Sequence, residues 1–122
     1  MALKVSGYAS SSGLKYKIVS QSAVIATADE DVLGTSGTVL SLEIHNQHSA
    51  TVHFKMKTTS GTYTAGATYP EYQFRIPATT NKRFDFPDGI TFSQLTFWCN
   101  DGPAFNDTDA PGGTVVVTFI CK

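Results

Sequence analysis

An alternation of aromatic and polar side chains around Pro87-Asp88-Gly89 constrains the fold of this chain more than any other feature. Phe84 and Phe86 precede these three residues two positions apart, and a further alternation leads on to Trp98. A period of two places every second side chain on the same face of a β-strand. Proline fixes its own φ, aspartate bonds nearby backbone, and glycine adopts positive φ. The segment therefore predicts a strand, a turn and a second strand around an aromatic face.

The same period of two recurs along the chain and predicts about eight short strands. No segment keeps an apolar period near 3.6 for three turns, so no long helix is expected. Short strands separated by frequent turn signals predict an all-β fold, a two-sheet antiparallel β-sandwich that is Ig-like or jelly-roll-like. The expected strands cover residues 14–20, 23–27, 38–46, 50–58, 69–76, 82–86, 95–99 and 114–121.

The clearest strands are residues 38–46 and 50–58, which a short turn separates, so an antiparallel hairpin is expected. The outward positions of this hairpin include His53 and Lys55. The other lysines of the chain are also expected on solvent-exposed strand faces. The run of valines from Val115 predicts a last strand covered on both faces. The expected inward residues of the hairpin are Leu40, Leu42, Ile44, Val52, Phe54 and Met56.

The inward positions change parity between Phe92 and Leu95. A single flat strand cannot change parity, so Ser93 and Gln94 must form a bulge, a bend or a crossing. We expect a loop that carries the chain from one sheet to the other, with Ile90 and Phe92 closing the end of the core.

The length of 122 residues fits one domain, which we place at residues 14–122. Residues 1–13 are Ser-rich and predict an extended N-terminal arm that is ordered only where something holds it. The N-terminus lacks a charged segment followed by an apolar core, so no signal peptide is expected. No apolar run approaches the ~20 residues that span a bilayer, so we expect no membrane partner.

The charge balance excludes classes of partner. The formal net charge is -1, which gives no bulk attraction to nucleic acid or to an anionic membrane. Charged residues make up 16% of the chain, below the roughly 25% of ordinary soluble proteins. Cys99 and Cys121 continue the apolar faces of their strands, so buried thiols are expected, and a disulfide stays open if the two strands are neighbours.

His45, His48 and His53 are close in sequence, and imidazole is a good zinc ligand. Strand parity places His45 and His53 on outward faces and His48 in a turn, with no nearby cysteine or convergent carboxylate. We therefore expect surface histidines and no metal site. A second group of oxygen ligands lies in one loop but has the wrong spacing for calcium, so it predicts a solvated turn; it consists of Asp101, Asp107 and Asp109.

No catalytic arrangement emerges from the sequence. No serine or threonine lies on a recognisable strained turn, and no glycine-rich phosphate loop opens a helix. We therefore expect no catalytic residue, no cofactor and no enzyme activity. Exposed aromatic side chains can instead stack on sugars or anchor an interface, although core positions are the alternative for each. The candidate interface residues are Tyr63, Tyr69, Tyr72 and Trp98.

Several short segments resemble small virion proteins of tailed bacteriophages. They are Asn46, Ala50, Val52, Phe54, Lys55 and Met56, then Ile76-Pro77-Ala78, then Asp85-Phe86-Pro87-Asp88-Gly89-Ile90, with Phe92-Ser93 and Leu95. Proteins of this kind are single β-sandwich domains attached to the capsid or the tail, and they tend to carry glycine where this chain has Gln94.

The resemblance implies a structural role without catalytic residues. The chain would be a capsid decoration or cement protein that binds neighbouring capsid or tail subunits in the virion, after synthesis and assembly in the host cytoplasm. Symmetric self-association, for example as trimers, would suit such a protein. The alternative is a carbohydrate- or receptor-binding module of a tail or head fibre, with the candidate aromatic residues as stacking surfaces.

Overall fold

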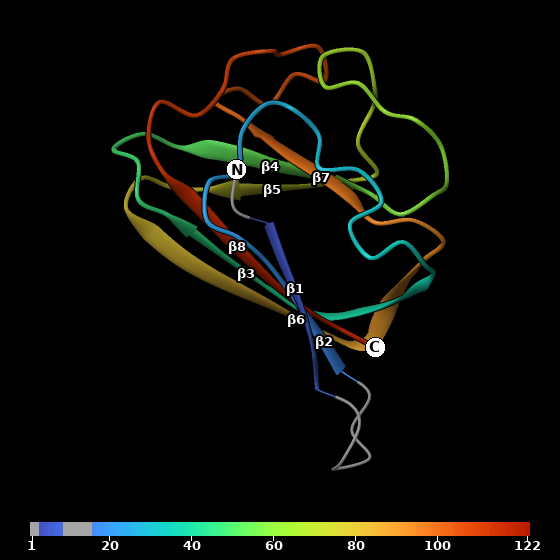
Figure 1. The fold of residues 1–122 in the computed structure, drawn as a ribbon. Helices are drawn as coiled ribbons and strands as arrows, with labels where there is room; N and C mark the ends of the chain where they lie inside the picture. Colours follow the sequence, from blue (N-terminus) through green and yellow to red (C-terminus); the bar gives the residue numbers. More distant parts are fainter. Residues whose placement is uncertain (1–2, 9–15) are drawn as a thin grey trace.

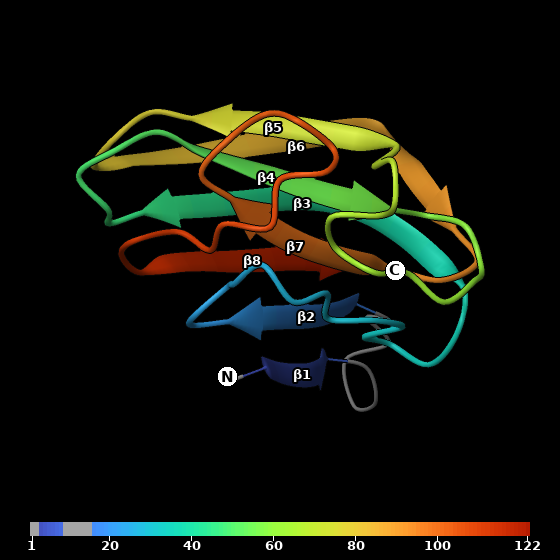
Figure 2. The same cartoon turned by 90° about the horizontal axis from the view of Figure 1, so that it is seen from above.

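The computed structural model describes residues 3–8 and 16–122, and its regular structure is entirely β (Figure 1). Five strands form one antiparallel sheet, sheet A, in the order β1-β2-β8-β3-β6, and three form sheet B in the order β5-β4-β7. The two sheets stack face to face (Figure 2), which confirms the predicted two-sheet β-sandwich. None of the described residues forms a helix that could cross a membrane. The strands are β1 (Leu3–Tyr8), β2 (Tyr16–Gln21), β3 (Gly37–Asn46), β4 (Val52–Lys57), β5 (Tyr72–Ile76), β6 (Thr80–Phe92), β7 (Thr96–Asn100) and β8 (Val115–Cys121).

The strand order is that of a jelly roll, because β2-β8-β3-β6 faces β7-β4-β5 and the early strand β2 lies beside the late strand β8. A jelly roll has one more strand beside β7, and here residues 23–32 occupy that position. The predicted strand at 23–27 is wrong, since this segment bonds to both sheets. The Val24 amide donates to the Val115 carbonyl at the start of β8, and the Ile25 carbonyl accepts from Cys99 in β7, each at 2.9 Å.

The predicted hairpin of residues 38–46 and 50–58 is wrong, because β3 lies in sheet A and β4 in sheet B. The turn between them crosses from one sheet to the other, and Asn46 holds this crossing. Its Nδ2 lies within hydrogen-bond distance of the carbonyl oxygens of Ala50 (2.9 Å), Ile76 (3.2 Å) and Pro77 (3.0 Å), while its Oδ1 accepts from the His48 amide (2.9 Å). The predicted inward residues of β4 are confirmed, since Val52, Phe54 and Met56 are fully buried.

The predicted turn at Pro87-Asp88-Gly89 is also wrong, because β6 runs through these residues as one strand of 13 residues. Asp85 pairs with Ser41 and Ile90 with Val39, so residues 86–89 all oppose Leu40. The three turn residues form a bulge, in which Gly89 adopts a φ of 75°. β3 is itself irregular at Leu40, where its register against β8 also shifts, so Val39 is fully buried and the predicted inward Leu40 is only half-buried.

The predicted crossing after Phe92 is confirmed, because β6 lies in sheet A and β7 in sheet B. Phe92 is buried at the end of the core, and the partly buried Ile90 packs against the core. In β8 buried and half-exposed residues alternate, so Val116 is half-exposed and the predicted cover on both faces is wrong. The core centre is aromatic, with the Phe54 ring 5.6 Å from Phe97 and 6.0 Å from Phe119.

Part of the predicted arm is a strand: β1 pairs with β2 from Leu3 opposite Gln21 to Tyr8 opposite Tyr16. Residues 1–2 and 9–13 of the arm lie outside the described residues. The expected buried thiols are confirmed, because Cys99 and Cys121 are free and fully buried and lie on strands of different sheets. Burial raises the pKa of each thiol to about 12.

Candidate functional site

Two long loops cover the outer face of sheet B (Figure 1). We call residues 58–71 the β4–β5 loop and residues 101–114 the β7–β8 loop. The outward positions of β4 are therefore buried, with His53 9% exposed and Lys55 0% exposed. The predicted solvent exposure of these two side chains is wrong, because strand parity shows the direction of a side chain and not what covers it.

Lys55 joins β4 to the loop above it. Its ammonium donates to Asn100 Oδ1 at 2.9 Å and to the Ala104 carbonyl at 2.7 Å. Burial lowers the pKa of Lys55, and the nearby charge of Asp107 opposes that change. A buried ammonium is tolerated only when acceptors replace its lost water, and here two acceptors do so.

The β7–β8 loop is organised by its own carboxylate. Asp107 accepts from the Gly102 amide at 2.6 Å and from the Asp109 amide at 2.8 Å. Asn100 Nδ2 donates to the Asp109 carbonyl at 3.2 Å, which closes the loop at its base. The acidic residues that predicted a solvated turn thus include one, Asp107, that fixes the backbone of the loop.

The three histidines do not converge. His45 is a half-exposed residue of sheet A, whereas His53 points outward from sheet B with Nδ1 3.1 Å from the Asp101 carbonyl. His48 in the crossing turn lies with Nε2 3.9 Å from an Asp101 carboxylate oxygen. Within residues 3–8 and 16–122, no three His, Cys, Asp or Glu side chains gather in a way that could hold a metal ion.

Trp98 is fully buried, so it offers no stacking surface and its place among the candidate interface residues is wrong. It lies opposite Lys55 in the pairing of β4 with β7, on the outer face of sheet B beneath the loops. Its Nε1 has no hydrogen-bond partner among the described residues. The full burial of Trp98 shows that the outer face of sheet B is covered at this position.

Tyr69 is the candidate residue that the structure leaves most exposed, at 68%. Its ring stacks on Phe105 with centroids 3.8 Å apart and planes inclined by 21°. The stack joins the β4–β5 loop to the β7–β8 loop. Sequence reasoning missed Phe105, although it is the one large apolar residue in the otherwise polar stretch 100–113.

The other two tyrosines are engaged elsewhere. The Tyr63 hydroxyl donates to the Thr59 carbonyl at 2.7 Å, and Lys57 Nζ lies 5.0 Å from the centre of its ring. Tyr72 is 36% exposed and pairs with the buried Met56, so it borders the core. Of the four predicted interface residues, Tyr69 is therefore the one whose side chain is mostly exposed.

A carboxylate fixes the base of the β4–β5 loop. Glu71 accepts from the amides of Thr58 at 2.7 Å and Thr59 at 3.2 Å, and Lys57 Nζ lies 3.6 Å away. Partial burial works to raise the pKa of Glu71, but these hydrogen bonds and the lysine charge outweigh it and lower that pKa. Lys55 therefore ties the β7–β8 loop to β4, and Glu71 joins the two ends of the β4–β5 loop beside Lys57 of β4. Sequence reasoning named Lys55 only as a solvent-exposed strand residue and did not single out Glu71.

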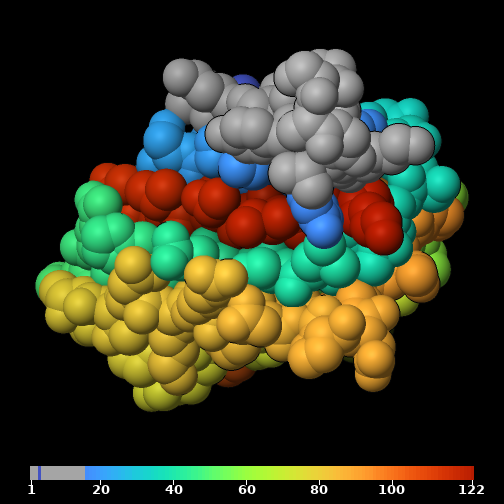
Figure 3. Space-filling model, turned by 90° about the horizontal axis from the view of Figure 1, so that it is seen from below, coloured from blue at the N-terminus to red at the C-terminus, as the bar shows by residue number. Residues whose placement is uncertain are grey.

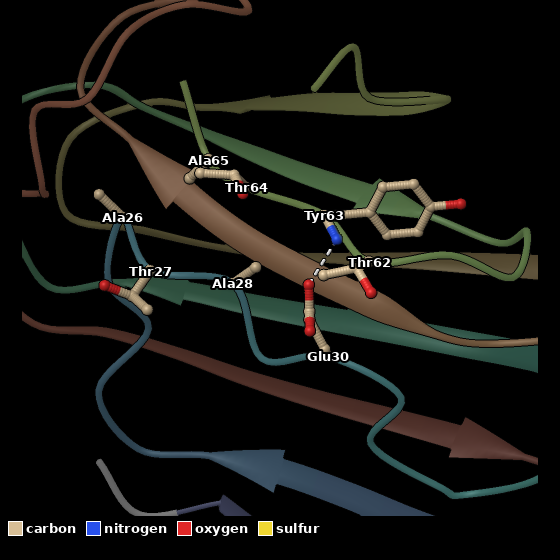
Figure 4. A pocket seen from close by; sticks show the side chains of 8 residues that line it. All are labelled: Ala26, Thr27, Ala28, Glu30, Thr62, Tyr63, Thr64 and Ala65. Atoms are coloured by element: carbon tan, nitrogen blue, oxygen red, sulfur yellow. Dashed lines mark hydrogen bonds between the residues drawn. The ribbon is translucent and has the colours of Figure 1, made fainter. Parts of the chain in front are cut away.

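A cavity of about 400 Å³ lies between the β4–β5 loop and the segment that follows β2 (Figure 4). Small side chains dominate its lining, and the ring of Tyr63 extends away from the alanines. Glu30 is the one ionisable carboxylate in it, and this group already accepts from the Tyr63 amide. The lining residues are Ala26, Thr27, Ala28, Glu30, Thr62, Tyr63, Thr64 and Ala65.

Comparison with protein-family models, with curated proteins and with solved structures finds no match for the chain. The two loops over sheet B and the cavity beside them are features that could contact a partner molecule. They offer the exposed ring of Tyr69, stacked on Phe105 of the other loop, and a cavity lined mainly by alanine and threonine side chains with one carboxylate, Glu30.

Proposed function

We propose that this protein is a non-enzymatic structural protein of a bacteriophage virion, a capsid decoration or cement protein that binds neighbouring capsid subunits. The observation that carries the proposal is the Tyr69 ring, which is 68% exposed and stacked 3.8 Å from Phe105. Tyrosine supplies large contact area with few rotatable bonds and recurs among the residues that dominate binding energy.

The fixed loops favour docking. Lys55 and Glu71 each anchor one of the loops through a hydrogen bond of 2.7 Å, which lowers the conformational freedom that these loops would lose on binding. The jelly-roll order supports the proposal by analogy of fold alone, because that architecture recurs in viral capsid domains. The protein would reside in the virion, assembled there as a homo-oligomer with capsid or tail subunits as partners.

The test is the location of the chain in purified particles. We expect mass spectrometry of gradient-purified virions to detect it and electron cryomicroscopy to place it on the capsid surface. Purified protein should rebind to particles that lack it, and Tyr69→Ala should weaken rebinding about tenfold or more. Tyr16→Ala, at a half-exposed tyrosine of β2, is the matched control and should rebind normally. Absence of the chain from particles, with the protein found only free in the lysate, would refute the proposal.

A second candidate is a carbohydrate- or receptor-binding module of a tail or head fibre. The exposed Tyr69 ring favours it, since sugars stack on aromatic faces, and the cavity of about 400 Å³ lies beside the same loop. Jelly rolls also recur in lectin domains. A glycan array without binders, or a binder that Tyr69→Ala leaves unaffected, would remove this candidate.

A further inference from the structure

One side of the sandwich carries two unpaired strand edges. The strand β6 is at the edge of sheet A and β5 is at the edge of sheet B, and Figure 2 shows the two along the same side. Neither pairs on that side with another described strand. The edge of β7 is different, because residues 23–32 cover it through the hydrogen bonds of Ile25, Asp29 and Val32.

Aromatic rings fill the gap between the two open edges without being fully covered. The Phe74 ring of β5 lies 4.7 Å from Phe84 and 6.4 Å from Phe86 of β6. All three phenylalanines are only partly buried, and Tyr72 beside them is 36% exposed. An unpaired edge flanked by partly exposed aromatic side chains is a template for pairing with another chain.

Two opposite charges lie on the outer face of β6. Arg83 Nε donates to Asp85 Oδ1 at 2.9 Å, and the side chains are 59% and 63% exposed. Figure 3 shows β6 along the border of the outer face of sheet A, so both charges are at the rim of that face. We propose that β6 pairs antiparallel with β6 of a second copy of this chain, around a twofold axis at Phe84, so that sheet A continues across the dimer.

The charges select this register. A twofold axis perpendicular to the sheet keeps outer side chains on the outer face. The axis must therefore pass midway between one residue of β6 and the same residue of the second copy, which lie directly opposite each other. An axis at Phe84 places Arg83 opposite Asp85 of the second copy, and the reverse pair follows by symmetry. An axis at Arg83 would oppose two arginines, and one at Asp85 two aspartates, and like charges directly opposite destabilise a sheet.

The apolar groups fit the same axis. Phe84 would lie opposite its own copy, about 4.5–5.5 Å apart between Cβ atoms, and the two phenylalanine clusters would join on the inner face. Pro87 lacks a backbone N–H and begins the bulged part of β6, which limits the pairing to the first part of the strand. The contact is therefore a short ladder with an aromatic centre and two ion pairs.

Charge reversal tests the register directly. We expect the wild-type protein to be a dimer by sedimentation velocity, and Arg83→Asp and Asp85→Arg each to raise the dimer dissociation constant about tenfold or more. An equimolar mixture of the two variants should form a heterodimer, because every facing pair then has opposite charges. The doubly swapped variant should dimerise like the wild type, and Lys17→Glu, at an exposed residue of β2, should change nothing.

Both substituted side chains are mostly exposed, so the variants should fold, which far-ultraviolet circular dichroism checks. A wild-type monomer or trimer, single variants with wild-type mass, or a mixture that stays monomeric would overturn the proposal. The inference does not rest on the proposed function: particle binding measured with Tyr69→Ala and self-association measured with the charge variants can each fail alone.

Discussion

The ammonium nitrogen of Lys55 lies 2.7 Å from the carbonyl oxygen of Ala104, so a side chain at the centre of β4 holds the loop that buries it. Its other acceptor is Asn100 of the neighbouring strand β7. The lysine and the loop therefore depend on each other, because the charge needs the loop carbonyl and the loop needs the donor. This mutual dependence can be measured.

Lys55→Met keeps most of the side-chain volume and removes the donor. The Ala104 carbonyl and Asn100 Oδ1 would then lack a partner, so we expect unfolding free energy to fall by about 1–3 kcal/mol. Urea unfolding measures this, and hydrogen exchange should show faster exchange at the Gly102 and Asp109 amides of the β7–β8 loop. Lys17→Met is the exposed control. Unchanged protection of the loop amides would contradict the role of Lys55 in holding the β7–β8 loop.

Asn46→Ala should lower unfolding free energy by about 1–3 kcal/mol, because it leaves buried carbonyls without a donor at the crossing between β3 and β4. Asn46→Asp distinguishes the donor role of the Asn46 side chain from its acceptor role. It keeps an oxygen for the His48 amide but cannot donate to Ile76 or Pro77, so it should fail to restore stability. Chemical denaturation of both variants measures the difference. If Asn46→Asp matched the wild type, the donor role would be refuted.

Gly89→Ala tests the bulge in β6. Gly89 has a φ of 75°, and an added Cβ would lie 2.2 Å from a methyl carbon of Thr38. Gly34 has a similar φ of 66° with nothing within 4 Å, so Gly34→Ala reports the backbone strain of about 1–2 kcal/mol alone. We expect Gly89→Ala to be clearly more destabilising by thermal unfolding. Equal losses for the two variants would mean that Thr38 moves aside freely.

The thiols of Cys99 and Cys121 should make the fold sensitive to alkali. Their pKa of about 12 in the folded chain compares with 9.0 for a free thiol. Between these values the unfolded chain loses protons that the folded chain keeps, so unfolding free energy should fall as the pH rises. Urea midpoints between about pH 8 and about pH 11 measure the slope. A variant with alanine at both positions should show a shallower slope, and an unchanged slope would exclude the thiols as its cause.

The period of two was sufficient to predict the sandwich and most of its inward residues, since burial of one sheet face imposes that period directly. Phe54 and Phe97 follow it without exception and both are fully buried. The crossing after Phe92 was also predictable, because a change of parity is a local signal of a change of sheet. Tyr69 was correctly singled out as an aromatic residue that is not inward.

Features that depend on distant segments were not predictable. The turn at Asn46 resembles a hairpin locally, and only the carbonyls of Ile76 and Pro77 show that it joins different sheets. Lys55 and Trp98 alternate correctly with the core, but the loops that cover them lie elsewhere in the sequence. Pro87-Asp88-Gly89 has the composition of a turn, and pairing with β3 on both sides turns it into a bulge.

The central position of β8 in sheet A has a consequence for synthesis. On the ribosome β2 and β3 emerge early, yet their shared neighbour β8 is the last of the described strands to leave the exit tunnel. Until then β3 can pair only with β6, and β2 only with β1. The nascent chain therefore carries unfilled ladder positions on β2 and β3 until β8 emerges, and closure of the larger sheet depends on contacts distant in sequence, which form slowly.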